Sequence, residues 1–144
     1  MTEREIKKTI VVDAIPQIVF RALTDENELP NWFPNAGAKV DLKVGGIIEL
    51  KTRRPDTGEV NTVKGKITRL VPDQQFSYTW SSEAYGGQSA VTWSLEPLEN
   101  DKTRVTLTHS GIVSDETRFA EADRGWSYFT DRLAKYCSRA AGPS

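Results

Sequence analysis

Residues 114–140 read SDETRFAEADRGWSYFTDRLAKYCSRA, and this stretch sets the fold of the chain. Large apolar residues recur in it at alternating steps of three and four, from Phe119 through Trp126 to Tyr136. That spacing is typical of one face of an α-helix. Ser114, which is followed by two acidic residues, is a suitable N-cap. The pattern predicts one long amphipathic helix of about 24 residues that ends before Gly142.

The residues before this helix follow a different period. Apolar and polar residues alternate in four runs, at residues 48–53, 76–80, 91–95 and 104–109. Such alternation is typical of antiparallel strands that have one buried face and one solvated face. Turn clusters rich in glycine, proline, asparagine and aspartate separate the runs. The pattern therefore predicts a meander of about five or six strands.

The N-terminal part of the sequence predicts a further strand and two short helices. Residues 5–13 are rich in β-branched side chains and read as a strand. Pro16 fits the first turn of a helix, and Thr24 or Asp25 is a suitable cap for a second helix. Two prolines within residues 29–34 break or kink that second helix.

Composition excludes several classes of protein. The 144 residues carry 19 Lys and Arg against 20 Asp and Glu, a net charge of −1, which argues against nucleic acid or an anionic membrane surface as partner. One cysteine and one histidine exclude an internal disulfide and most zinc sites, so we expect no metal and no cofactor. No apolar stretch has the length of a signal peptide or a membrane span, and we expect a cytoplasmic protein.

A sheet with one apolar face and a helix with one apolar stripe bury both surfaces when the sheet curves around the helix. We therefore predict an α+β fold in which residues 1–144 form a single domain. A strongly curved sheet cannot contact a straight helix along its whole length, so large side chains or a ligand must fill the space between them.

The candidate residues for that space are aromatic side chains and the sole histidine. They are Trp32, Phe33, Tyr78, Trp80, Trp93, His109, Phe119, Trp126 and Phe129. Two interpretations stay open, a core filled by these rings or an apolar cavity lined by several of them. His109 itself is either a buried structural histidine, bonded to a neighbouring backbone group, or a group that transfers a proton or binds a ligand. We expect Cys137, near the C-terminus of the long helix, to be unreactive.

Eight short stretches of the sequence carry a resemblance to a known family. They are VFRALTD at 19–25, NWFP at 31–34, VGG at 44–46, GKI at 65–67, LVP at 70–72, YTW at 78–80, TRVTLTHSG at 103–111 and GW at 125–126. In this order they resemble the START-like (SRPBCC) helix-grip superfamily, and within it the family similar to the C-terminal domain of the heat-shock-protein-90 ATPase activator. The resemblance implies the helix-grip fold, with a curved antiparallel sheet around a long C-terminal helix. It also implies a hydrogen-bonding role for His109 at a pocket.

The resemblance extends to function, because members of the superfamily are mostly ligand binders and some cyclise polyketides. We therefore expect a protein that binds an apolar or aromatic small molecule, lipid-like or polyketide-like, between the sheet and the C-terminal helix. No catalytic residue is assigned. One alternative is a protein-interaction module with a chaperone partner, of the heat-shock-protein-90 ATPase activator type. The other is a cyclase-like or hydrolase-like enzyme that uses His109.

Overall fold

A computed structural model of the chain describes residues 4–33, 37–53, 57–82, 87–113 and 115–140. Its elements follow in the order β1 (Arg4–Val12), α1 (Pro16–Thr24), η1 (Leu29–Asn31), β2 (Gly37–Val40), β3 (Ile47–Arg53), β4 (Val60–Val71), β5 (Gln75–Ser82), β6 (Gly87–Leu98), η3 (Glu99–Asp101), β7 (Lys102–Ile112) and α2 (Glu116–Ala140). The predicted α+β fold, with a first strand, a later meander and a long C-terminal helix, is confirmed.

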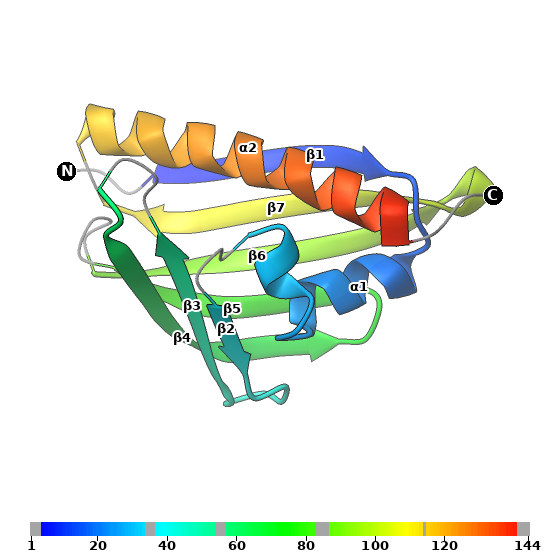
Figure 1. Cartoon of the computed structure of the whole chain (residues 1–144), viewed down its shortest axis with the longest axis horizontal. Helices are drawn as coiled ribbons and strands as arrows, with labels where there is room; N and C mark the ends of the chain where they lie inside the picture. The colour runs from blue at the N-terminus through cyan, green and yellow to red at the C-terminus, as the bar shows by residue number, and fades with distance from the viewer. Residues whose placement is uncertain (1–3, 34–36, 54–56, 83–86, 114, 141–144) are drawn as a thin grey trace.

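The strands form one antiparallel sheet in the order β1-β7-β6-β5-β4-β3-β2, and Figure 1 shows this sheet curving around one side of the molecule. A register shift in β4 between Ile67 and Arg69 marks a β-bulge, which bends and twists a strand. Close beside it, Gly65 leaves no room for a side chain, because a Cβ there would collide with the backbone oxygen of Thr79. The glycine lets β4 and β5 approach closely, and the bulge bends β4.

The inner face of the sheet is built by cross-strand rows. Tyr78 on β5 pairs with Val91 on β6, which pairs in turn with His109 on β7. Trp80 pairs with Ser89 in the neighbouring row. Successive side chains of a strand point to opposite faces, so the residues two apart in each run share the buried face, as the alternation predicts.

Helix α2 packs on this face through the predicted stripe. Its buried residues include Trp126, Leu133 and Cys137, and its backbone runs closest to β1 and α1. Figure 1 shows α2 lying along β1, with α1 on the same side of the sheet. Ser114 lies outside the described residues, and Asp115 acts as a cap, because its Oδ1 accepts a hydrogen bond of 2.8 Å from the backbone N–H of Arg118.

The second short helix is smaller than predicted. Only one 3₁₀ turn, η1, forms over Leu29–Asn31, because Pro30 has no N–H to continue a hydrogen-bonded helix. Asp25 ends α1 and accepts a bond of 2.8 Å from the N–H of Asn27, so it forms a turn and caps no second α-helix. This turn carries Trp32 and Phe33 into the interior.

Candidate functional site

Aromatic rings from several elements meet between α2 and the central strands. Five of them contact one another, and we call them the ring cluster: Phe33, Trp80, Trp93, His109 and Trp126. The centroid of Trp126 lies 5.3 Å from that of Phe33 and 5.6 Å from that of Trp80. It lies 5.8 Å from Trp93 and 5.9 Å from His109. Each member is at most 7% exposed, so the cluster is part of the protein interior.

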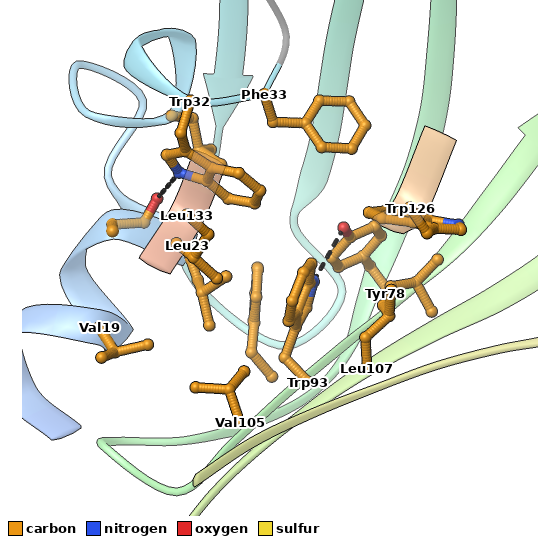
Figure 2. Packing of buried hydrophobic residues seen from close by; sticks show 14 of the residues in the cluster. Val19, Leu23, Trp32, Phe33, Tyr78, Trp93, Val105, Leu107, Trp126 and Leu133 are labelled. Carbon is orange, nitrogen blue, oxygen red and sulfur yellow. Dashed lines mark hydrogen bonds between the residues drawn. The ribbon is translucent and has the colours of Figure 1, made fainter. Parts of the chain in front are cut away.

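The other predicted residues lie around the cluster at different distances. Phe129 is half-buried and stacks on Phe33 at 4.6 Å, and Figure 2 shows Trp32 and Tyr78 beside the cluster residues that it labels. Trp32 contacts Trp93 edge-on, with centroids 5.8 Å apart. Phe119 is the exception, because it lies about 10 Å before Trp126 along α2. The Arg4 guanidinium covers the Phe119 ring at 4.0 Å.

Hydrogen bonds from side chains of α2 hold the turn that carries Trp32 and Phe33. The Nε of Arg132 donates to the carbonyl oxygen of Trp32 at 3.1 Å, and its Nη2 donates to that of Asn31 at 3.4 Å. Tyr136 donates its hydroxyl proton to a Glu28 carboxylate oxygen at 3.0 Å. These bonds hold the backbone of the turn, while the ring of Phe33, which has no polar atom, is held by packing alone.

His109 is fully buried and forms hydrogen bonds through both ring nitrogens. The indole N–H of Trp126 donates to its Nδ1 at 3.0 Å, and an indole nitrogen can only donate. Nδ1 therefore carries no proton, and Nε2–H donates to the hydroxyl of Ser89 at 2.7 Å. Ser89 donates in turn to the carbonyl oxygen of Trp80 at 3.2 Å. The donor order runs from Trp126 through His109 and Ser89 to the Trp80 backbone, and it fixes the neutral tautomer of His109.

This arrangement bears on the two interpretations of His109. Burial lowers the pKa of His109 to about 4 from its ordinary value of 6.5, so the ring is neutral at physiological pH. Its partners are the side chains of Trp126 and Ser89, whereas the structural interpretation expected a backbone group. Both ring nitrogens are thus engaged within the protein in this conformation. The hydrogen bond to Nδ1 ties the indole of Trp126 to β7.

Cys137 lies on the buried side of α2, as predicted. The side chain is fully buried, and burial, followed by the negative charge of Glu28, raises the pKa of its thiol to about 12. A thiol in this state is protonated and a poor nucleophile.

Trp80 differs from the other rings of the cluster in one respect. Its Nε1 is buried, and no hydrogen-bond acceptor lies within reach of it in the part of the chain that the structure describes. Trp80 is nevertheless surrounded by rings, with centroid distances of 5.2 Å to His109 and 6.0 Å to Phe33. The ring cluster therefore contains one unused hydrogen-bond donor.

Sequence reasoning missed two residues that shape this site. Ser89 lies two residues before Val91 and four before Trp93, so the alternation of β6 already placed it on the buried face. Its role in a hydrogen-bonded network depends on Trp80 and His109, which lie on neighbouring strands. Arg132 carried no signal, because the groups that it binds in the turn are backbone carbonyls about 100 residues away in the sequence.

The surface hollows that described residues line include the following two, and neither of these contains a residue predicted for the site. One, of about 540 Å³, lies between the start of α1, the turn from β4 to β5, and β6. The other, of about 160 Å³, lies on β2 and β3. Within the described ranges, no group of three or more His, Cys, Asp or Glu side chains could hold a metal ion. No helix among those ranges is long and apolar enough to cross a membrane.

Comparison with known proteins places the fold among solved structures. A search of curated proteins gives no match. CalU16 from Micromonospora echinospora is 28% identical, with a TM-score of 0.73 over 96% of this chain and 78% of that one. CV1439 from Chromobacterium violaceum is 25% identical, with a TM-score of 0.79 over 93% and 96%. The Aha1 dimer from Colwellia psychrerythraea, at 24% identity, has a TM-score of 0.78 over 96% and 99% and shows the fold alone.

The family match covers the elements that build the ring cluster. Residues 13–138 match the family described as Activator of Hsp90 ATPase homolog 1-like protein. The match begins in the loop after β1, includes the turn that carries Phe33 and every strand from β2 to β7, and ends near the C-terminus of α2. It confirms the resemblance seen in the sequence: this chain belongs to the family of Activator of Hsp90 ATPase homolog 1-like proteins.

Proposed function

We propose that this protein binds a flat apolar small molecule at the ring cluster, between the central strands and α2. One observation carries the proposal. The backbone of α2 runs closest to β1 and α1, and the ring of Trp126 spans the space to the central strands, where it contacts Trp80 and Trp93. Both contacts are edge-on, and a wall of flat aromatic rings suits a flat apolar molecule that takes the place of one of them.

Phe33 is the ring that such a ligand would displace. Trp93 donates its indole N–H to the hydroxyl of Tyr78 at 3.3 Å, and His109 and Trp126 are hydrogen-bonded to each other. Phe33 has no such bond, and it follows a single 3₁₀ turn. A ligand in its place would stack on Phe129, which now stacks on Phe33 with an angle of 18° between the rings.

Phe33→Ala should increase the affinity for fluorene, a flat tricyclic hydrocarbon, by about tenfold. The substitution removes a competing ring that contacts Trp80, and an apolar space in a protein interior binds apolar molecules. Isothermal titration calorimetry of the wild type and the variant measures the change. The proposal also requires saturable binding of fluorene to the wild type.

Phe76→Ala is the matched control. Phe76 is fully buried in the same interior, but its ring contacts are with Phe20 and Tyr78. Phe76 lies opposite Trp93 on β6, but its ring does not occupy the place proposed for the ligand, which is that of Phe33. This variant should therefore bind fluorene like the wild type. An equal gain in both variants would show that any cavity in this core binds fluorene, and the proposed site would then be wrong.

The two alternative functions inferred from the sequence both stay predictions. A chaperone partner follows from family membership alone and stays a prediction. An enzyme that uses His109 also stays a prediction, although both ring nitrogens bond to protein side chains and so do not face a substrate in this conformation.

A further inference from the structure

The four tryptophans of the chain differ in how their indole N–H groups are used. Trp32 donates to the carbonyl oxygen of Ala22 at 2.8 Å. Trp93 donates to the Tyr78 hydroxyl at 3.3 Å. Trp126 donates to His109 at 3.0 Å. Only the N–H of Trp80 has no acceptor in the described part of the chain.

Keeping this donor buried and unpartnered is unfavourable for the free protein. A polar group that leaves water without a new hydrogen bond loses the free energy of its hydration. Trp80 is only 7% exposed, and the rings of Phe33, His109 and Trp126 lie against it. An acceptor delivered by a ligand would recover the lost hydrogen bond at this position.

The hydrogen bonds around Trp80 determine which hydrogen-bonding group that ligand must carry. Ser89 already donates to the Trp80 carbonyl, and His109 donates to Ser89. Trp126 uses the remaining ring nitrogen of His109. The group that remains unpaired is the indole N–H of Trp80, which is a donor. A ligand that pairs with it has to supply a hydrogen-bond acceptor. A neutral carbonyl oxygen fits this environment, because burying a carboxylate among uncharged rings is much more costly.

We propose that the indole N–H of Trp80 selects flat aromatic ligands that carry a neutral carbonyl oxygen, such as aromatic ketones, lactones and quinones. The selection rests on the proposed function, since it requires a ligand at the ring cluster. It adds a specificity-determining residue and a chemical class to that site. Ligands of the same shape without the oxygen bind more weakly, because they leave the donor unpartnered.

Fluorenone and fluorene test this selection, because they share one tricyclic skeleton and differ by a carbonyl in place of a methylene group. Calorimetry should give about tenfold tighter binding of fluorenone to the wild type. Trp80→Phe removes the indole N–H and should remove this preference, so that the two compounds bind the variant with about equal affinity. Phe76→Leu removes a ring whose contacts are with Phe20 and Tyr78, so this variant should keep the preference for fluorenone.

A second measurement needs no variant that must stay folded. In the NMR spectrum of the wild type, fluorenone should move the indole N–H proton of Trp80 downfield to a hydrogen-bonded position, whereas fluorene should shift it without reaching such a position. Equal affinities for the two compounds, or fluorenone binding without that downfield shift, would overturn the selection and leave the proposed function intact. Failure of both compounds to bind would instead overturn the proposed function, and the selection with it.

Discussion

Trp126→Ala should lower the free energy of unfolding by about 5 kcal/mol, the upper end of the range for a buried aromatic residue. Trp126 is 5% exposed and is the one ring of the cluster that contacts all four others. Its loss leaves a large void and removes the donor to His109 Nδ1, a buried acceptor that would then lack this bond. Denaturant unfolding at neutral pH measures the change.

Two further variants separate the contributions to this loss. Trp126→Phe keeps a ring in the cluster and removes the donor, so it should cost about 2 kcal/mol. Tyr128→Ala, on the same helix, removes a ring that is 58% exposed and should cost less than about 1 kcal/mol. If Trp126→Ala cost no more than Tyr128→Ala, Trp126 would not be central to the interior.

Acidification should destabilise the protein by about 3 kcal/mol through His109 alone. Its pKa is about 4 in the folded protein and has the ordinary value of 6.5 in the unfolded chain, and the difference converts to this free energy. Below pH 6.5 the unfolded chain binds a proton that the folded protein does not. The stabilisation is therefore complete above pH 6.5, falls as the pH drops towards about 4, and changes little through this group below that.

NMR measures this titration directly, because the sequence contains a single histidine and its ring C–H signals are unambiguous. They should stay constant in the folded protein from neutral pH down to about pH 5. Unfolding by denaturant across the same range should show the loss of stability. Most carboxylates titrate below about pH 5. The loss of stability above that pH is therefore due to protonation of His109 in the unfolded chain. A midpoint near 6.5 in the folded protein would contradict the buried neutral ring.

Much of the fold could be predicted because periodicity reports directly on burial. The steps of three and four in residues 114–140 place Trp126, Leu133 and Cys137 on the buried side of α2. The alternation of β5 likewise places Tyr78 and Trp80 on the buried face. The prolines in residues 29–34 predict that the second short helix is broken, but that only one 3₁₀ turn of it forms depends on contacts that sequence spacing does not contain.

The site could be predicted only as a set of residues facing one interior. That Trp126 donates to His109, and that Trp80 has no acceptor within the described ranges, depends on distances between side chains from different elements. Sequence spacing does not contain these distances. The same limit explains Phe119, which shares the apolar stripe of α2 but lies about 10 Å from Trp126 along the helix axis.

An NMR titration with fluorene tests binding at the ring cluster most directly. A ligand at this position should cause saturable shifts of the indole N–H signals of Trp80 and Trp126, with Trp80→Phe used to assign the Trp80 signal. The backbone signals of Gln17 and Gln74, which line the hollow of about 540 Å³ on the surface, should stay in place. Saturable shifts at Gln17 and Gln74, with both indole signals unchanged, would place the ligand in that hollow and contradict binding at the ring cluster.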